Sequence, residues 1–357
     1  MPALPPHKQG ERANGRNGTG TRGGVGRVSG VFAAIDLGTN NCRLLVAEPT
    51  GREFRVIDGF SRIVGLGEGV SRAGVLSEAA IQRTLAALKV CANKMKKRHV
   101  TQSRCVATQA VRAAGNSDAF LKRVRDETGI QMEIISSQEE AELTLSGCLS
   151  LLDLTQEYAL LFDVGGGSAE VVWAKVSSND AVNIEGWTSL PCGVVTLTEQ
   201  HKQQEFSVVE YKALVSEVMN MLRPFDLQFG ITEQISAGSV QMVGTAGTVT
   251  TIAGVNMQLP RYNRSRVDGS WLSFDAVERI SRKLSSQTFE ERARHPCIGH
   301  NRADLIVAGC AVLEAFCHLW PAGGLCVADR GVREGILNVM VMQGGASGDG
   351  VTAFTPD

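Results

Sequence analysis

The chain has 357 residues, of which 43% are hydrophobic and 20% charged, and its formal net charge is −1. This length favours two globular domains, and the near-neutral charge argues against a general nucleic-acid or membrane binder. The nine cysteines form no CxxC pair, which favours reduced thiols in a cytoplasmic protein over a disulfide frame or a zinc site.

The first 30 residues differ in composition from the rest of the chain. They contain eight glycines and five Lys or Arg residues but a single acid, and no hydrophobic stretch follows the charges. We expect residues 1–30 to form a disordered tail rather than a secretory signal. A transit peptide is less favoured, because the glycines oppose a helix. The C-terminal segment 344–357 ("GGASGDGVTAFTPD") is predicted to be a second loose end.

Strand-like and helix-like patterns alternate after residue 30. Apolar, β-rich runs predict three strands at 31–37, 42–48 and 52–60, and the turn "GTNN" joins the first two. Apolar residues at helical spacing then predict a helix that begins after Ser77. The series continues with a strand at 103–108, a helix between Asn116 and Gly129, a strand at 130–136 and a helix at 137–153.

The pattern then restarts, which indicates an internal duplication. Aligned without a gap, "AAIDLGTNNCRLLVAE" and "LLFDVGGGSAEVVWAK" place Asp36 on Asp163, 127 positions later. One Asp-x-Gly turn between strands is common, but here two occur in matching contexts. We therefore predict two related domains, at 31–152 and 153–343, whose turns meet at one cleft. The last helix of the second domain is free to pack back on the first.

Three consecutive glycines in the second segment raise the question of what approaches the backbone there. Exposed N–H groups in a glycine turn bind phosphate oxygens, because a Cβ would block the approach. Carboxylates beside the turns offer hard oxygen ligands for a divalent cation. The predicted phosphate-binding residues of the two turns are Gly38, Thr39, Asn40, Asn41, Gly165, Gly166, Gly167 and Ser168, and the carboxylates are Asp36 and Asp163.

Seven blocks of the sequence resemble, in order, those of the exopolyphosphatase/guanosine pentaphosphate phosphohydrolase (Ppx/GppA) family. They are "IDLGTNNCRLLV", "ATQAVRAAGN", "EIISSQEEAEL", "FDVGGGSAEVV", "GTAGTVTT", "RADLIVAG" and "RGVREGIL". The resemblance covers about residues 31–340. It implies an α/β fold of duplicated ribonuclease H-like (actin-like ATPase) domains that face an interdomain cleft, in a short two-domain form.

The resemblance also implies roles for carboxylates. Glu140, in the "EEA" block, corresponds to the proposed general base that deprotonates water. Asp163 and Glu170, together with Asp36, correspond to ligands of Mg²⁺ or another divalent cation. From the residues alone, Glu139 and Glu140 are better explained as first-turn acids of a helix, and strand alternation permits Glu170 to be an outward-facing residue.

Basic and hydroxyl residues complete the site that the resemblance implies. Arg112, which follows Thr108 in "ATQAVRAAGN", would clamp the terminal phosphate through two N–H donors. Gly247 and Thr248, in "GTAGTVTT", would form a further anion-binding turn. The alternatives are a surface arginine and an ordinary strand–helix loop.

The chain departs from the family pattern at two positions. Gly65 precedes "LGEG", where a basic residue is expected, and Asn41 replaces a more usual serine. These departures put in doubt how tightly distal phosphates are held. Two basic segments, 94–99 ("KMKKRH") and 261–266 ("RYNRSR"), are candidates for a polyanion path, with solvated surface as the alternative.

These residues favour a Mg²⁺-dependent phosphohydrolase, which removes the terminal phosphate of inorganic polyphosphate or of guanosine pentaphosphate. We expect no specific nucleic-acid partner and no membrane partner, and a homodimer is left open. One alternative is a kinase of the same fold, although no acceptor pocket with a catalytic Asp is evident. The other is a nucleotide-sensing module without enzymatic activity.

Overall fold

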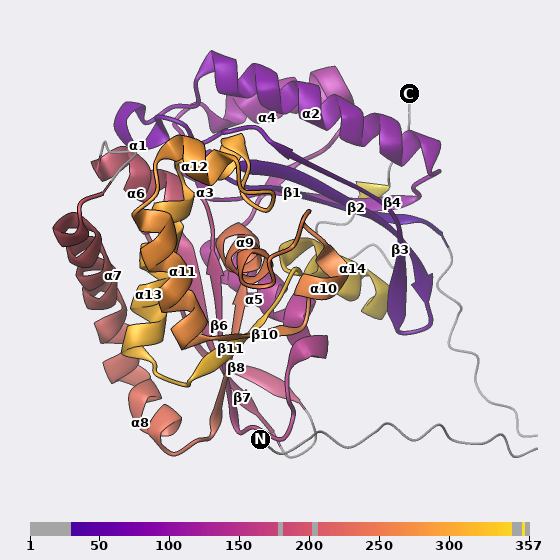
Figure 1. Cartoon of the computed structure of the whole chain (residues 1–357). Helices are drawn as coiled ribbons and strands as arrows, with labels where there is room; N and C mark the ends of the chain where they lie inside the picture. Colours follow the sequence, from indigo (N-terminus) through magenta and orange to yellow (C-terminus); the bar gives the residue numbers. More distant parts are fainter. Residues whose placement is uncertain (1–29, 178–180, 202–205, 345–351, 354–357) are drawn as a thin grey trace, which may run out of the picture.

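The computed structural model describes residues 30–177, 181–201, 206–344 and 352–353 (Figure 1). The tails predicted at 1–30 and 344–357 lie almost wholly outside these residues. Two β-sheets form the framework, and helices pack around them. None of the helices in the described part is both long and apolar enough to cross a membrane.

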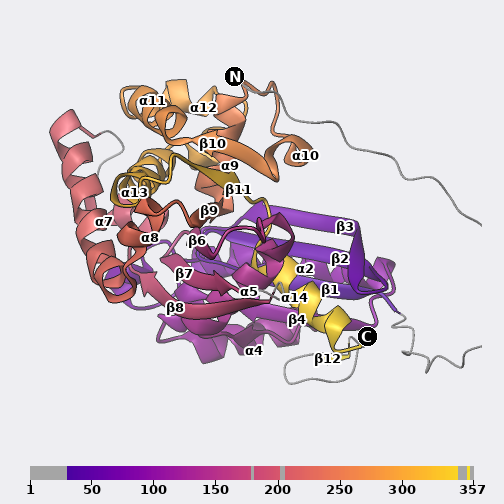
Figure 2. The ribbon, with the colours of Figure 1, turned by 90° about the horizontal axis from the view of Figure 1, so that it is seen from below.

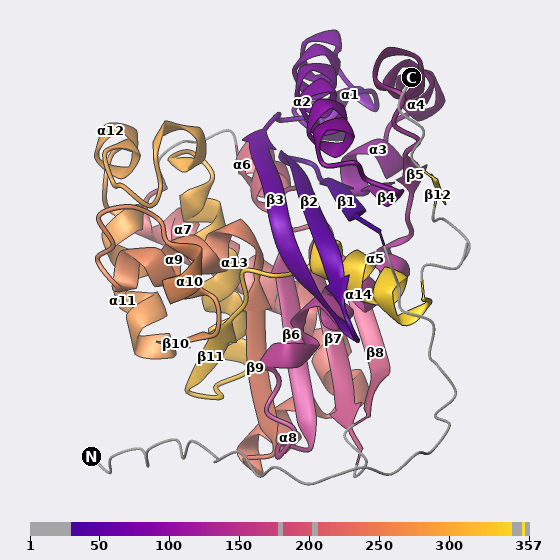
Figure 3. The ribbon, with the colours of Figure 1, turned by 90° about the vertical axis from the view of Figure 1, so that its right-hand side faces the viewer.

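The first sheet uses strands from the N-terminal part of the chain and one short C-terminal strand (Figure 3). Its order is β12-β4-β1-β2-β3, and β5 also pairs with β4. β1, β2 and β3 are antiparallel neighbours, whereas β4 runs parallel to β1 and β5 runs parallel to β4. The strands are β1 (Phe32–Leu37), β2 (Asn41–Thr50), β3 (Glu53–Ile63), β4 (Gln102–Ala107), β5 (Glu133–Ile134) and β12 (Thr352–Ala353).

The second sheet lies below the first in Figure 3 and has the order β10-β11-β9-β6-β7-β8. β6, β7 and β8 are antiparallel neighbours, β9 runs parallel to β6, and β11 runs parallel to β9. The strands are β6 (Tyr158–Val164), β7 (Ala169–Val176), β8 (Val182–Leu190), β9 (Val240–Thr245), β10 (Ser270–Ser273) and β11 (Gly324–Val327).

The two sheets share one topology, which confirms the predicted α/β duplication. In each, a three-stranded antiparallel meander continues into two strands that run parallel to its first strand. The agreement extends to an irregularity of register. The β2–β3 and β7–β8 ladders shift register at Val46/Ala47 and at Trp173/Ala174, where β3 and β8 each contain one extra residue; these two positions are related by the same offset as Asp36 and Asp163. The domain bounds at residues 152 and 343 stay predictions.

Helices cover the outer faces of both sheets. α2 and α4 share a core cluster with the first sheet, and α7, α11 and α13 share one with the second. Ser77 caps α2 as predicted, since its side chain accepts a hydrogen bond from Ala80 N. The helices are α1 (Val70–Ala73), α2 (Glu78–Lys97), α3 (Gln109–Arg112), α4 (Ser117–Thr128), α5 (Ser137–Cys148), α6 (Val194–His201), α7 (Val208–Phe229), α8 (Ile231–Ser236), α9 (Ala246–Asn256), α10 (Arg264–Val267), α11 (Phe274–Ser285), α12 (Phe289–Ala293), α13 (Ile306–Leu319) and α14 (Val332–Met342), with 3-10 turns at Leu149–Leu151 and His300–Arg302.

α5 and α14 lie side by side between the two sheets (Figures 2 and 3). α5 follows the first sheet in the chain, yet its Leu145 shares a core cluster with Val172 of the second sheet. α14 follows the second sheet, yet its Ile336 shares a core cluster with Phe32 of the first. Each helix therefore crosses from one half of the molecule to the other, and its N-terminal end is placed between the two sheets.

Candidate active site

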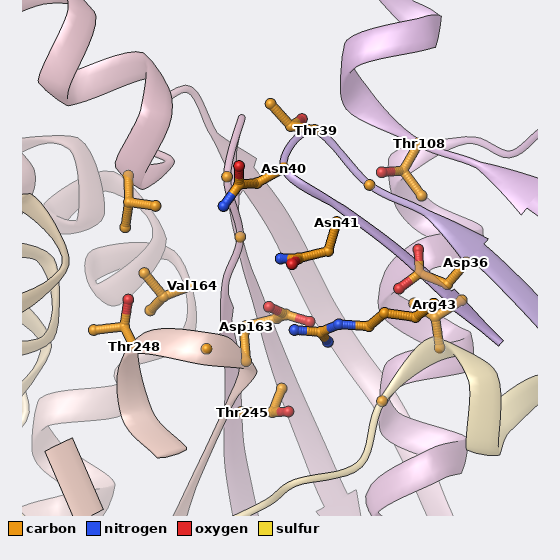
Figure 4. A pocket seen from close by; sticks show the side chains of 18 of the residues that line it. Asp36, Thr39, Asn40, Asn41, Arg43, Thr108, Asp163, Val164, Thr245 and Thr248 are labelled. Atoms are coloured by element: carbon orange, nitrogen blue, oxygen red, sulfur yellow. The ribbon is translucent and has the colours of Figure 1, made fainter. Parts of the chain in front are cut away.

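A single pocket opens between the sheets, at the turn ends of the β1–β2 and β6–β7 hairpins (Figure 4). Its volume is about 1100 Å³ when the open solvent at its mouth is included. Separate parts of the chain line it: the two hairpins, the N-terminal ends of α3, α5, α6, α9 and α13 with the turn before α13, and the segment that leads into α14.

The pocket brings together nearly all of the residues that the sequence singled out. Thr108 lines it as well. Of the predicted site residues, only Arg112 is not part of the lining. The predicted residues that line the pocket are Asp36, Gly38, Thr39, Asn40, Asn41, Glu140, Asp163, Gly165, Gly166, Gly167, Ser168, Glu170, Gly247 and Thr248. Their individual roles stay predictions.

The two hairpins present different charges at the same structural position. On β2, Arg43 lies directly opposite Asp36 of β1, and on β7, Glu170 lies directly opposite Asp163 of β6. The Arg43 side chain extends across the pocket toward Asp163 (Figure 4). The first hairpin thus contributes one cation and one anion to the pocket, whereas the second contributes two anions.

The glycine turn of the second hairpin touches the first hairpin. A Cβ on Gly167 would lie 2.5 Å from Thr39 Oγ1, and a Cβ on Gly166 would lie 3.1 Å from Thr39 Cβ and 3.2 Å from Asn40 Cβ. The first distance is a clash, and the other two are tighter than ordinary van der Waals contact. The sequence interpretation was that these glycines make room for a phosphate. The structure shows that they also make room for the opposite turn, which brings the two predicted phosphate-binding turns together; phosphate binding by these glycines stays a prediction.

Burial perturbs the carboxylates of the pocket. Burial, together with repulsion from the nearby Glu170 carboxylate, raises the pKa of Asp163 to about 7. It also raises the pKa of Glu140 well above the ordinary value, and repulsion from Glu170 again adds to the effect. Burial likewise raises the pKa of Glu170 and of Asp36. Four carboxyl groups that are costly to ionise together would be stabilised by a cation or by a positively charged donor.

The carboxylates fit a magnesium ion that is only partly coordinated by protein. Within the described residues, no group of three or more His, Cys, Asp or Glu side chains is close enough to enclose a metal ion. Mg²⁺ does not require such a cage, since it usually keeps several waters and binds one or two carboxylates plus substrate phosphates. Asp163 and Glu170, directly opposite each other on adjacent strands, match that requirement.

Glu140 lies in the first turn of α5, and its side chain is 13% exposed. Arg112 lies behind it, with Nη2 3.3 Å from Glu140 Oε2. The same guanidinium donates to Ile135 O at 2.7 Å and to Gln109 Oε1 at 2.8 Å. Its N–H groups are thus engaged within the protein, so this geometry suits orientation of Glu140 better than a direct grip on phosphate.

The neighbouring Glu139 has a different environment. It pairs with Arg104 of β4, outside the pocket lining. The two adjacent acids of the "EEA" block therefore separate into one that faces the pocket and one that does not. The family block favoured Glu140, and the structure places that residue, and not Glu139, on the pocket lining.

Sequence reasoning missed the arginines of the pocket. Arg43, Arg302, Arg330 and Arg333 all line it. Arg330 is held by Asp268 at 2.8 Å, and Arg333 lies 3.9 Å from Glu334. In the described part of the chain neither Arg43 nor Arg302 forms a hydrogen bond to a carboxylate; Arg302 donates to Thr251 Oγ1 at 2.9 Å.

The signal for these arginines was present in the sequence. Arg302 and Arg333 belong to the "RADLIVAG" and "RGVREGIL" blocks, which were recognised but given no role. Burial lowers the pKa of both guanidinium groups, because a charge without full solvation is less stable. Arg302 also lies beside the turn at Gly247, where a Cβ would be 3.8 Å from its Cζ. These cations would bind the oxygens of a polyanion.

Fold and site together define an α/β protein of two halves with a pocket between them. The pocket offers hydrogen-bond donors that can bind an anion and carboxylates that can bind a cation. Residues 45–343 match the Ppx/GppA phosphatase family, and the chain belongs to that family. This confirms the predicted family and, with it, the prediction of an enzyme of the phosphatase kind.

Similarity to individual proteins agrees with this membership. Exopolyphosphatase 2 of Mycobacterium tuberculosis is 31% identical over 298 residues, which cover 79% of this chain and 88% of that protein. A bifunctional 3-dehydroquinate synthase/phosphatase of Fusobacterium nucleatum is 31% identical over 302 residues, which cover 79% of this chain but only 42% of that protein. The crystal structure of the Aquifex aeolicus PPX-GPPA enzyme is similar with a TM-score of 0.70 and 28% identity, over 87% of this chain and 99% of that one.

Proposed function

We propose that this protein hydrolyses the terminal phosphoanhydride bond of inorganic polyphosphate or of guanosine pentaphosphate, with Mg²⁺ as cofactor. The observation that carries the proposal is the composition of one pocket. Two glycine-containing turns and four arginines line that pocket together with four carboxylates whose pKa values are raised by burial. The similarity to an exopolyphosphatase supports polyphosphate as the first substrate to test.

Binding of the substrate depends on the cationic side of the pocket. The backbone N–H groups of the glycine turns would bind the terminal phosphate. Arg43, Arg302 and Arg333 come from three distant parts of the chain and line the same pocket. They would neutralise the phosphates that follow the terminal one and hold the scissile bond in place.

The carboxylate pair of the second hairpin would hold the metal. Asp163 and Glu170 would bind Mg²⁺, with Asp36 close enough to act through water. The ion would offset the negative charge of the transferred phosphoryl group.

Glu140 would act as the general base. A water oxygen forms a bond to the terminal phosphorus while the bridging P–O bond breaks, and the proton of that water passes to the Glu140 carboxylate. The raised pKa of Glu140 suits this role, because a base with a pKa closer to the working pH accepts a proton more readily. Arg112 would keep the carboxylate oriented.

One experiment separates this function from its alternatives. Purified protein is incubated with polyphosphate, with guanosine pentaphosphate, and with ATP plus candidate acceptors, each with Mg²⁺ and with EDTA. We expect Mg²⁺-dependent release of inorganic phosphate without any acceptor. Release only in the presence of an acceptor would favour a kinase, and binding without turnover of any substrate would favour a sensor.

A further inference from the structure

We propose that Ser189 is a positioning residue for Glu170, and that together with Ser168 it occupies one carboxylate oxygen and leaves the other free for the metal. Ser189 is outside the pocket lining, and no motif in the sequence singles it out. The inference rests on the proposed metal-dependent hydrolysis, and its test is chosen to be independent of turnover.

The contacts on Glu170 are asymmetric. Ser168 Oγ donates to Glu170 Oε1 at 2.5 Å, and Ser189 Oγ donates to the same oxygen at 2.9 Å. The carboxylate is buried, with 3% of the residue exposed, so water does not compete freely for this oxygen. Two hydroxyl donors on one oxygen fix the plane of the carboxylate and use its main acceptor directions.

The other oxygen lies on the side of the glycine turn. A Cβ on Gly165 would be 4.0 Å from Glu170 Oε2. Neither serine hydroxyl donates to Oε2, so this oxygen remains available to a ligand in the pocket. Glu170 is thereby prepared to bind a cation through a single oxygen, which is the mode expected of Mg²⁺.

Strand register explains how β8 reaches the site. Ser189 lies directly opposite Glu170 in the β7–β8 pair, so both side chains stand on the same face of the sheet. The first hairpin has a serine at the equivalent place, because Ser61 of β3 lies directly opposite Arg43. Ser61 is exposed, and its partner Arg43 has no oxygen that could accept a hydrogen bond from the serine hydroxyl. The serine is thus common to both halves, but only the second half uses it to hold a carboxylate.

The duplication supplies a matched set of variants. Ser189→Ala removes one of the two donors, Ser189→Thr keeps a hydroxyl on a strand that favours Thr, and Ser61→Ala makes the same deletion at the equivalent position of the other half. Mn²⁺ is used as the probe, and its binding is measured by electron paramagnetic resonance without substrate. Phosphate release is then titrated with Mg²⁺.

We expect Ser189→Ala to weaken Mn²⁺ binding by about tenfold, as is usual when a residue that orients a metal ligand is lost. The Mg²⁺ midpoint for activity should rise in parallel, and Ser189→Thr and Ser61→Ala should stay close to wild type. Unchanged Mn²⁺ affinity in Ser189→Ala, or equal loss in Ser61→Ala, would overturn the inference.

A double variant tests whether Ser189 acts through Glu170. In a Glu170→Gln background, Ser189→Ala should weaken Mn²⁺ binding no further. A full additional loss would show that Ser189 acts elsewhere and would contradict the proposal. If wild type binds Mn²⁺ but releases no phosphate from any substrate, the proposed function fails while the Mn²⁺ series still decides the role of Ser189.

Discussion

The two hairpins of this protein share a backbone but differ in chemistry. β1–β2 and β6–β7 agree in register, in topology and in the position of the register shift against the next strand. They differ at one inward position, where the first has Arg43 and the second has Glu170. A phosphoryl-transfer site needs cations for the phosphates and anions for the metal. A duplicated fold can supply both cations and anions when the side-chain charge differs at one pair of equivalent residues.

The surroundings of the two hairpins reinforce this division. Glu170 receives two hydroxyl donors, which suit a carboxylate that must keep its orientation. Arg43 extends into the pocket toward Asp163 (Figure 4) and is not bound to a carboxylate within the described part of the chain. We therefore propose that the side chain of Arg43 on the first hairpin binds the polyanion and that the carboxylates of the second hairpin bind the cation.

The largest expected effect concerns a residue outside both hairpins. If the hairpins only bind phosphate and metal, the water must be activated from α5. Glu140→Gln should lower kcat by about 10²–10⁴-fold, because it removes the base and keeps its shape. Phosphate release from polyphosphate gives kcat, and circular dichroism checks the fold. Glu139→Gln is the matched control, since Glu139 pairs with Arg104 outside the pocket. Equal losses in both variants, or near-normal kcat in Glu140→Gln, would remove Glu140 from this role.

The next effect concerns the contact between the hairpins. Gly167→Ala would place a Cβ 2.5 Å from Thr39 Oγ1, and relief of such a clash costs about 1–3 kcal/mol. The two turns should then move apart, and KM should rise by about 5- to 150-fold, with a smaller change in kcat. Gly115→Ala is a control, because its Cβ would meet its nearest neighbour at an ordinary 3.5 Å. An unchanged KM would show that the turns need not meet to bind phosphate.

The anionic hairpin should also make stability depend on pH. The pKa of Asp163 is raised to about 7 in the folded state, against about 4 when unfolded. The folded form keeps a proton that the unfolded form has lost, so this stabilising effect is full below pH 4 and is lost as the pH rises through 7.

In EDTA, Asp163→Asn should therefore lose less thermal stability between pH 5 and 8 than wild type does. Between pH 5 and 8, the loss in free energy of unfolding should differ between the two proteins by on the order of a few kcal/mol. At pH 8, Mg²⁺ should raise the melting temperature of wild type more than that of Asp163→Asn. Differential scanning fluorimetry measures the melting temperatures in EDTA and in Mg²⁺. Asp118→Asn, at an exposed position, is the control. Parallel stability curves for wild type and Asp163→Asn would contradict the account of the buried carboxylates.

The smallest effect concerns the two basic segments outside the hairpins. Lys94 and Arg98 both pair with Asp58 of β3, at 2.7 and 2.9 Å, so segment 94–99 is partly neutralised. Segment 261–266 instead adjoins the pocket, since Arg264 donates to Glu334, a lining residue, at 2.7 Å.

Neutralising the exposed Arg261 and Arg266 to Gln should raise KM for long polyphosphate a few-fold and flatten its salt dependence. A substrate of three or four phosphates should be unaffected. Neutralising Lys97 in the other segment should change neither. Equal responses of long and short substrates would show that segment 261–266 does not contact the chain beyond the pocket.

The fold could be predicted largely from the sequence. The gapless match of Asp36 to Asp163 indicated the duplication, and the register of both hairpins confirms it. Elements with a strong local pattern, such as α2, lie where they were predicted. The strand predicted at 130–136 is reduced to the two residues of β5, because only Glu133 and Ile134 pair with β4. Pairing between distant strands decides such lengths, and an apolar run alone does not reveal it.

The site could be predicted only in part, for a related reason. Residues in the turns and in "EEA" were found because turn chemistry and family blocks are local in sequence. Arg43, Arg302 and Arg333 were missed, because their convergence depends on how the two sheets and α14 pack. The glycine turns were found, but their contact with each other was not, because contact between the turns of the two halves is a tertiary feature; phosphate binding by these turns stays a prediction.

The most direct test of the division between the hairpins is a Mg²⁺ titration of phosphate release in Glu170→Gln and in Arg43→Gln. The two variants change equivalent positions, and each leaves the other hairpin intact. The account predicts that Glu170→Gln raises the Mg²⁺ midpoint at least about tenfold with a smaller change in substrate KM. It predicts the reverse for Arg43→Gln, an increased KM and an unchanged Mg²⁺ midpoint. If both variants shift the Mg²⁺ midpoint and KM alike, the first hairpin is not specialised for substrate binding and the second is not specialised for metal binding. The central claim is then wrong.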